Sequence, residues 1–356
     1  MRSDYTEINR AIPAPDAAAA ADTKKKWDSV AKPLNGLGEL EDLIIKIGAL
    51  TGTSSVDIGK RAVLVLCADN GVVAEGVTQT DASVTAIMAG QIMKKQSSVC
   101  KMAAVAGADV FPVDMGMLSR VPGVGGLHAA DGTANFSLGP AMTEEETDAA
   151  IQYGIALVRK YKEMGYKLLV TGEMGIGNTS TSSAVASVLL GLPVEEVTGR
   201  GAGLSDDGLQ RKIRAIRKGI EVNRPDPSDA FDVLMKLGGF DIAGMTGMFI
   251  GGALYGIPIV IDGLISSIAA LIAARLCPAS TAALIPSHSS AEPAAKAISE
   301  ELGITPIIYA GMKLGEGTGA VCMLPILDMA LAVYDGSVGF SSAGVKQYEN
   351  LGGDKR

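Results

Sequence analysis

The stretch from Lys167 to Leu190, KLLVTGEMGIGNTSTSSAVASVLL, constrains the fold of this chain most strongly. Its opening apolar run, Leu168 to Val170, predicts a buried strand, and Ser183 to Leu190 predicts a helix of small and apolar residues. The turn that joins them is rich in glycine, with Gly172, Gly175 and Gly177. A strand that enters a helix through such a turn is typical of a parallel α/β sheet.

This turn also has the features of an anion site. The first N–H groups of a helix have no partner inside the helix, and the macrodipole adds partial positive charge there. Glycines let the backbone approach a phosphate closely, and Asn178 and Thr179 are candidates to cap the helix. Glu173 is unhelpful for phosphate but suits a ribose hydroxyl or a developing cation. The turn is neither a Walker A motif nor a G-x-G-x-x-G fingerprint, so a tight turn without a ligand remains the alternative.

The composition favours a globular chain with an aliphatic core. Of 356 residues, 47% are hydrophobic, only 4% are aromatic and 44 are glycine, which suits helices packed closely on a parallel sheet. The net charge of -8 argues against a nucleic-acid or membrane-surface binder. The four cysteines are widely spaced and form no metal-ligand pattern, so we expect reduced thiols in a cytoplasmic protein without a bound metal.

Membrane targeting is not indicated by the sequence. Met1 to Ala11 is polar, which predicts no signal peptide. The segment from Ile242 to Ala274 has Asp262 as its only charged residue. Because glycines and a proline interrupt it, we expect a helix, a strand and a second helix buried against a sheet rather than a membrane span.

Further strands are predicted over residues 62–68, 109–114, 257–262, 282–286 and 304–309, with helices between them. This alternation predicts a doubly wound, mostly parallel sheet, and Pro112 indicates an edge strand. Polar residues follow several of these strands, including Asp69-Asn70-Gly71 and Ser287 to Ser290. Open α/β sheets place their sites at such strand ends, although Asp-Asn-Gly equally fits a tight turn.

A second glycine-rich loop surrounds Arg200 and is followed by a helix that Ser205 is expected to cap. That helix carries Lys212, so two glycine loops and a lysine together suit a phosphate, and a solvated helix face is the alternative for its cations. Glu316 lies in another glycine loop. Its proximity to polar strand ends indicates that it faces a cleft rather than open surface.

The helix expected over residues 82–95 carries an apolar stripe. Val84, Ile87, Met88, Gln91 and Ile92 share one helical face. Such a stripe is more often core than ligand pocket, so we expect it to pack against the sheet.

Several stretches together, in one order along nearly the whole chain, resemble the nicotinate-nucleotide:dimethylbenzimidazole phosphoribosyltransferase family of cobamide synthesis. The matching stretches are KPLNGLGELE at Lys32, ADNGVVAEGV at Ala68, GEMGIGNTSTSSA at Gly172, GRGAGLSDDGLQRK at Gly199, GGFDIAGMTG at Gly238, DGLISSIAALIA at Asp262, PSHSSAEPA at Pro286 and KLGEGTGA at Lys313.

The resemblance implies a Rossmann-like large domain over residues 59–310 and a small helical domain built from residues 1–58 and 311–356. It further implies a transferase that moves 5-phosphoribose from nicotinate mononucleotide to a cobamide lower-ligand base, giving nicotinate and an α-ribotide. Nicotinate mononucleotide is then a substrate, and no cofactor is implied. Family members form dimers, so we expect a homodimer or a heterodimer with a homologous chain.

The resemblance also implies roles for individual residues. Glu316 is the expected general base and Glu173 the expected partner of the donor ribose, where a carboxylate can stabilise an oxocarbenium-like carbon. The other implied site residues form two groups, one for each substrate. The phosphate and ribose group is Gly175, Gly177, Asn178, Thr179, Gly201, Lys212 and Ser290, and the acceptor group is Gln79, Ile87, Met88 and Leu314.

Three departures from the family pattern lie mostly on the acceptor side. Asn70 stands where the family usually has histidine, Ile87 where it often has glutamine, and Leu34-Asn35-Gly36 where it usually has proline-glycine-serine. A phenolic acceptor is therefore an option beside benzimidazoles and purines, as in family-like heterodimers that activate phenol or p-cresol. The alternatives are a weakly active subunit that completes a homologous partner chain, and an unrelated Rossmann-like oxidoreductase, which the missing G-x-G-x-x-G disfavours.

Overall fold

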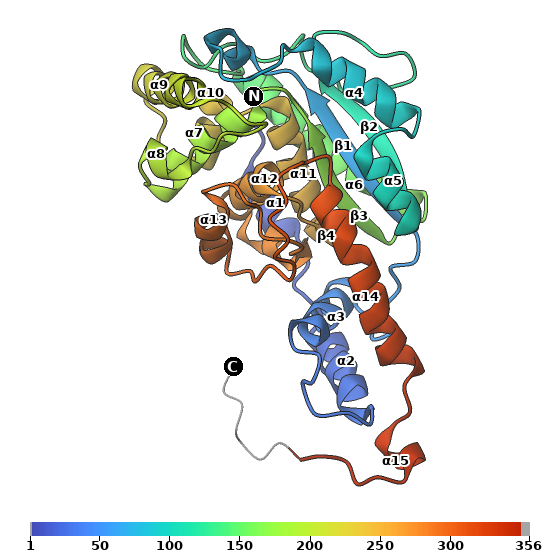
Figure 1. Cartoon of the computed structure of the whole chain (residues 1–356). Helices are drawn as coiled ribbons and strands as arrows, with labels where there is room; N and C mark the ends of the chain where they lie inside the picture. Colours follow the sequence, from blue (N-terminus) through green and yellow to red (C-terminus); the bar gives the residue numbers. More distant parts are fainter. Residues whose placement is uncertain (1, 350–356) are drawn as a thin grey trace. The chain divides into compact units, whose positions relative to one another are not determined.

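A single parallel sheet organises the computed structural model, which describes residues 2–349 (Figure 1). Its five strands run in the order β2-β1-β3-β4-β5, and every neighbouring pair is parallel. They span Arg61–Ala68 (β1), Ala108–Gly116 (β2), Leu168–Met174 (β3), Ile259–Val260 (β4) and Leu284–Ile285 (β5). The predicted fold class is confirmed, and Pro112 lies on the edge strand β2, as expected.

The register of the sheet brings the carboxyl ends of the central strands to one edge. Leu66 of β1 pairs with Val113 on one side and with Glu173 on the other. The chain proceeds outward from β1 in both directions, to β2 and to β3, so the strand order reverses there. In open α/β sheets this switch point opens a crevice at the carboxyl ends of the strands.

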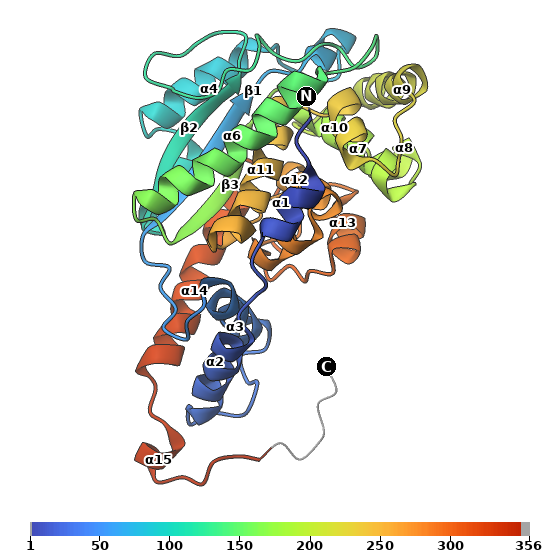
Figure 2. The same cartoon turned by 180° about the vertical axis from the view of Figure 1, so that it is seen from behind.

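Helices cover both faces of the sheet. Helices α4 (Ser83–Met93) and α5 (Ser98–Val105) pack near β1 and β2 (Figure 1), and α6 (Glu144–Glu163) crosses the sheet when it is seen from behind (Figure 2). The buried helix α11 (Phe240–Tyr255) packs directly on α6. A Cβ on Gly154 of α6 would lie 2.0 Å from the Gly244 carbonyl oxygen, so glycine is what permits this close approach.

The other elements of this part of the chain follow the predicted alternation. They are α1 (Tyr5–Ala11), α7 (Asn178–Leu190), α8 (Val194–Val197), α9 (Asp206–Asn223), α10 (Ala230–Leu237), α12 (Leu264–Leu276), α13 (Ala295–Leu302) and the 3₁₀ turns Gly71–Glu75 and Pro278–Ala283. The predicted cap of α9 is confirmed, because the Ser205 hydroxyl accepts from the Gly208 N–H at 3.2 Å. The segment from Ile242 to Ala274 forms helix, strand and helix as expected.

The chain divides into two compact units, with bounds that differ from the expected domains. The larger holds the residues up to Pro13 together with Ile58–Met323, and the smaller holds Ala14–Asp57 and the residues after Met323. Helix α1 belongs to the larger unit because Asn9 Oδ1 accepts from the Ala279 N–H at 2.9 Å.

The smaller unit is helical, as expected. It contains α2 (Ala17–Ser29), α3 (Glu39–Thr51), α15 (Phe340–Ala343) and most of the long helix α14 (Thr318–Gly336). The rings of Trp27 and Tyr334 lie 5.0 Å apart in its core, and the Tyr334 hydroxyl donates to the Ser54 carbonyl at 2.7 Å.

The expected strand over residues 304–309 is wrong. Ile308 forms only an isolated bridge with His288, and the N–H groups of Ile307 and Ile308 both donate to the Ser287 carbonyl. Pro306 lacks an N–H, so this segment cannot extend a ladder of hydrogen bonds.

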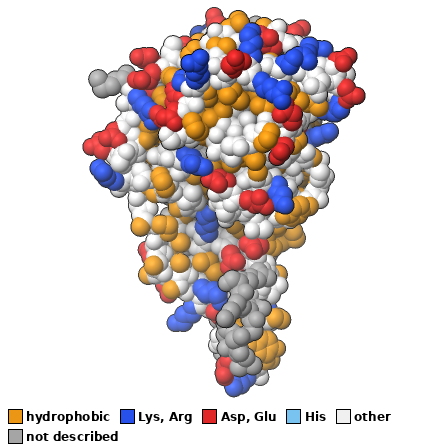
Figure 3. Space-filling view, turned by 90° about the vertical axis from the view of Figure 1, so that its left-hand side faces the viewer, with side chains coloured by type: hydrophobic (Ala, Val, Ile, Leu, Met, Phe, Trp, Pro, Cys, Tyr) orange, Lys and Arg blue, Asp and Glu red, His pale blue; other side chains and the backbone are white. Residues whose placement is uncertain are grey.

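Two surface properties bear on membrane and nucleic-acid binding. By length and composition alone, α14 is apolar enough to span a membrane; 44% of its 18-residue window is buried, and core helices of soluble proteins pass the same test. On the face shown in Figure 3, basic and acidic side chains are interspersed. That face therefore carries no continuous basic patch.

Candidate active site

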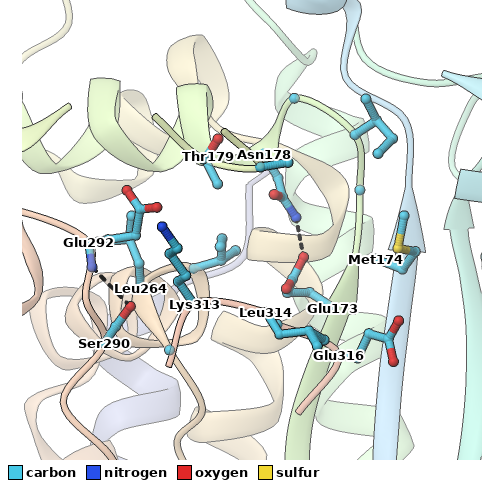
Figure 4. A pocket seen from close by; sticks show the side chains of 18 of the residues that line it. Glu173, Met174, Asn178, Thr179, Leu264, Ser290, Glu292, Lys313, Leu314 and Glu316 are labelled. Atoms are coloured by element: carbon cyan, nitrogen blue, oxygen red, sulfur yellow. Dashed lines mark hydrogen bonds between the residues drawn. The ribbon is translucent and has the colours of Figure 1, made fainter. Parts of the chain in front are cut away.

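A cavity opens where the carboxyl ends of the strands meet the two glycine-rich loops (Figure 4). Its walls come from the end of β3, the residues after β4 and β5, and the loop before α14. It brings together most of the residues predicted from the sequence. Those lining it are Gln79, Glu173, Gly175, Gly177, Asn178, Thr179, Gly201, Ser290, Leu314 and Glu316.

Lys212 does not line this cavity but is buried directly behind it. Its ammonium donates to Thr179 Oγ1 at 2.8 Å and to the Gly199 carbonyl at 3.1 Å. One side chain thus ties the first glycine loop to the second. Burial lowers the pKa of Lys212 to about 8, partly offset by the charge of Glu292. A solvated helix face is therefore the wrong interpretation for Lys212, whereas it holds for the exposed Arg214.

Most of the apolar stripe on α4 does not form core. Ile92 is its one buried member, Ile87 is 56% exposed, and the other buried residues of the helix are Thr85 and Ala89. Thr85 faces the protein interior because its hydroxyl accepts a hydrogen bond from the N–H of Ile176 in the first glycine loop, at 3.2 Å. This requirement turns Ile87 outward. Ile87 and Met88 lie outside the described cavity walls, and their acceptor role stays a prediction.

Hydrogen bonds with neighbouring elements hold the first glycine loop in place. Gly177, with φ of +96°, is the N-cap of α7, so Asn178 is not the cap and that expectation is wrong. The Asn70 amide donates to the Ile176 carbonyl at 3.3 Å. The Asn178 N–H already donates to the Gly175 carbonyl at 3.0 Å. Any phosphate at this loop must therefore use N–H groups other than those of Ile176 and Asn178.

Glu173 lies near the end of β3, with its carboxylate against the N-terminus of α7. The Asn178 side-chain amide donates to Glu173 Oε2, as Figure 4 shows, and to Asp241 Oδ2 at 2.9 Å. Glu173 is only 7% exposed. Burial, and then the neighbouring charge of Asp241, raise the pKa of Glu173 well above its usual range.

Glu316 is held in a strained position between two glycines. Its φ of +61° is unusual for a residue with a side chain, and Gly315 and Gly317 flank it with φ of +89° and +91°. Its Oε2 accepts from the Val99 N–H of α5 at 3.2 Å. Burial raises the pKa of Glu316, which makes its carboxylate a stronger base than an exposed glutamate.

Asp262, two residues after the end of β4, anchors the loop that carries Glu316. Its two oxygens accept from the Gly317 N–H at 3.2 Å and from the Ala320 N–H at 2.9 Å. Asp262 is the last residue of a strand predicted from the sequence, but no role for it followed from the sequence. Asp241 was missed because it immediately precedes the long apolar stretch that begins at Ile242, and no local pattern marks it as a site residue.

Comparison with known proteins identifies the family. The sequence model of a family described as phosphoribosyltransferase matches residues 12–345. The chain is 45% identical over 328 residues to the nicotinate-nucleotide–dimethylbenzimidazole phosphoribosyltransferase of Acetivibrio thermocellus, covering 92% of this chain and 93% of that protein.

The chain belongs to the nicotinate-nucleotide–dimethylbenzimidazole phosphoribosyltransferase family.

Other members of the nicotinate-nucleotide–dimethylbenzimidazole phosphoribosyltransferase family agree with this assignment. The enzyme of Ruminiclostridium cellulolyticum is 44% identical, with coverage of 92% of this chain and 94% of that one. Among solved structures, CobT from Thermus thermophilus superposes with a TM-score of 0.87 at 35% identity, covering 93% of this chain and all of that one. This chain is thus an enzyme of the phosphoribosyltransferase class, which excludes the oxidoreductase alternative.

Proposed function

We propose that this chain transfers the 5-phosphoribosyl group of nicotinate mononucleotide to an aromatic base that becomes the lower ligand of a cobamide. The products are nicotinate and an α-ribotide. The observation that carries this proposal is the cavity that places Glu173 and Glu316 together beside two glycine loops joined by Lys212. The names of the relatives, which specify this donor and dimethylbenzimidazole, support it.

The donor phosphate is assigned to the loop end of the cavity. Gly175, Gly177 and Gly201 offer close backbone approach, Thr179 and Ser290 offer hydroxyl groups, and Lys212 supplies charge from behind. Asn178 contributes to donor binding through the hydrogen bond that its amide donates to Glu173, and not by contacting the phosphate. Glu173 then faces the donor ribose and stabilises positive charge as the anomeric carbon becomes oxocarbenium-like.

The transfer step balances without a cofactor. The bond between the anomeric carbon and the pyridinium nitrogen breaks, and its electron pair neutralises the departing nicotinate ring. A nitrogen or oxygen of the acceptor forms the new bond with its own electron pair. The proton that the acceptor loses, from the other ring nitrogen of an azole or from the attacking hydroxyl of a phenol, passes to Glu316. Because Glu316 is buried with a raised pKa, its carboxylate is a suitable base for that proton.

For the acceptor we propose an azole of the benzimidazole type, with phenols and purines as the competing classes. Gln79 and Leu314 line the cavity, and Leu314 is 57% exposed. The Gln79 amide donates to the carbonyls of Ala202 and Gly203, so this side chain holds the second glycine loop as it faces the cavity.

The decisive experiment is a product assay of the purified chain with nicotinate mononucleotide and a panel of acceptors. The panel contains dimethylbenzimidazole, adenine, phenol and p-cresol, and products are separated by mass. We expect nicotinate release and an α-ribotide with dimethylbenzimidazole. Absence of nicotinate release with every acceptor, by the chain alone and with a homologous partner, would refute the proposal.

A second candidate is a subunit that completes a homologous partner chain. The exposed Ile87 on α4 favours it, because the predicted acceptor residues of that helix lie outside the cavity walls of one chain. Activity that arises only when a co-encoded homologue is added would establish this alternative, whereas full activity of a homodimer would exclude it. We expect either assembly in the cytoplasm.

A further inference from the structure

Asp241 is a buried carboxylate beneath the active site to which the proposed reaction gives no task. It lies in the first turn of α11, where its Oδ1 accepts from the Ile242 N–H at 2.9 Å. Its Oδ2 accepts from the Asn178 amide at 2.9 Å. A Cβ on Gly175 would lie 2.8 Å from Oδ2, and one on Gly239 would lie 2.8 Å from Oδ1. The carboxylate is therefore enclosed on two sides and has little freedom to move.

Asn178 connects this carboxylate to the active site. Its Nδ2 donates both to Asp241 Oδ2 and to Glu173 Oε2. Ionised carboxylates only accept hydrogen bonds, and only the NH₂ end of an asparagine donates them, so two ionised carboxylates at Nδ2 permit a single orientation of the amide. If Asp241 were absent, the amide could turn and present its oxygen to Glu173.

We propose that Asp241 is a positioning residue: it fixes the Asn178 amide, which in turn holds the Glu173 carboxylate toward the donor. The direction toward the donor ribose rests on the proposed function, whereas the linkage among the three side chains does not. The arrangement is comparable to a carboxylate that fixes a histidine tautomer, with an amide in place of the ring.

The charges around Glu173 give this linkage a distinctive signature. Asp241 of α11 and Asp262 after β4 disfavour its ionised form, while Asn178 and the backbone of Glu316 favour it. The negative charge of Asp69, directly after β1, in turn disfavours the ionised form of Asp241. Asp241 thus acts on Glu173 in two opposed ways, by its own negative charge and by the hydrogen bond that it secures from Asn178.

Two substitutions separate these effects in the ligand-free protein. Asp241→Asn keeps an acceptor oxygen for Asn178 but removes the charge, so the titration midpoint of Glu173 should fall by ~1 pH unit. Asn178→Ala removes the hydrogen bond but keeps the charge, so the midpoint should rise by a similar amount. Loss of packing alone would not move the midpoint in opposite directions. ¹³C NMR of labelled glutamate carboxyls measures it, with Glu173→Gln to assign the signal.

Asp114→Asn is the matched control. Asp114 is also a buried carboxylate at a strand end, but it accepts from the Gly116 and Met117 N–H groups and lies against His128. Its replacement should leave the Glu173 midpoint unchanged. Thermal unfolding of each variant confirms that it is folded. If Asp241→Asn does not fold, Asn178→Ala still decides, because an unmoved midpoint in that variant overturns the linkage.

Kinetics extend the test to the reaction. Asp241→Asn should move the acid limb of the kcat profile to lower pH and Asn178→Ala should move it to higher pH, with the KM for nicotinate mononucleotide changed only a few-fold. Midpoints that move in the same direction, or not at all, overturn the proposal. If the wild-type enzyme is inactive but the Glu173 midpoint moves in the two predicted directions in the variants, the result counts against the proposed function and leaves the linkage established.

Discussion

Lys212 of α9 and Thr179 of α7 lie on helices that follow different glycine-rich loops, yet the Lys212 ammonium donates to the Thr179 hydroxyl at 2.8 Å. The same ammonium reaches the Gly199 carbonyl at 3.1 Å. Lys212 therefore does two things at once: it joins the two loops, and it places a positive charge behind the proposed phosphate position. Both roles lead to measurable consequences.

Lys212→Ala should weaken the binding of nicotinate mononucleotide by ~1.5–3 kcal/mol, because a charged hydrogen-bond donor is lost. Isothermal titration calorimetry measures this directly. Lys218→Ala is the control, since Lys218 is an exposed lysine on the same helix and should leave affinity within error. An unchanged dissociation constant in Lys212→Ala would remove this lysine from the phosphate site.

The affinity for the donor should also depend on pH through Lys212. Burial lowers the pKa of Lys212 to about 8 in the free protein, and the protonated form is the one that attracts phosphate. As pH rises through about 8, the ammonium is lost and the dissociation constant should increase. Titrations across the alkaline range test this, and the Lys212→Ala variant should show a nearly flat profile over the same range.

Glu316→Gln should lower kcat by ~10²–10⁴ while donor binding stays close to normal, since the amide keeps the shape but cannot accept the proton. Steady-state rates of nicotinate release, combined with calorimetry of donor binding, separate the two effects. Glu300→Gln on the exposed surface of α13 is the control. Turnover within a few-fold of wild type would exclude Glu316 as the base.

Ile87→Gln should shift acceptor preference from phenols toward benzimidazoles, because the amide supplies a hydrogen-bonding group on the exposed face of α4. The measurement is the ratio of kcat/KM values for p-cresol and dimethylbenzimidazole. Val105→Gln, at a position 88% exposed on α5, is the control for a generic surface change. A ratio that stays constant would show that Ile87 does not contact the acceptor in the working enzyme.

Gly154→Ala should lower the free energy of unfolding by ~1–3 kcal/mol, although residue 154 does not line the active site. Its added Cβ would lie 2.0 Å from the Gly244 carbonyl oxygen, so α6 and α11 must separate. Gly139→Ala is the control, because a Cβ there meets no atom within 4 Å. Denaturant unfolding compares the two, and equal midpoints would show that the helices adjust without cost.

Much of the fold follows from local patterns. The apolar run into β3, the glycine turn and α7 are adjacent in sequence, so spacing and glycine content suffice to predict them. The same holds for the Ser205 cap of α9 and for the placement of Glu316 in a glycine loop. Parallel pairing then follows from the alternation of strands and helices, and it brings strand ends such as Asp262 to a common edge.

What the tertiary structure alone decided concerns contacts between distant segments. The sequence pattern of α9 does not reveal that Lys212 is buried between two loops, nor does the pattern of α4 show that Thr85 must face inward to hold the Ile176 N–H, which turns Ile87 outward. The link from Asp241 through Asn178 to Glu173 is likewise absent from any local pattern. Spacing specifies which residues share a face of one element, whereas the burial of a charge or an amide depends on which other elements pack against that face.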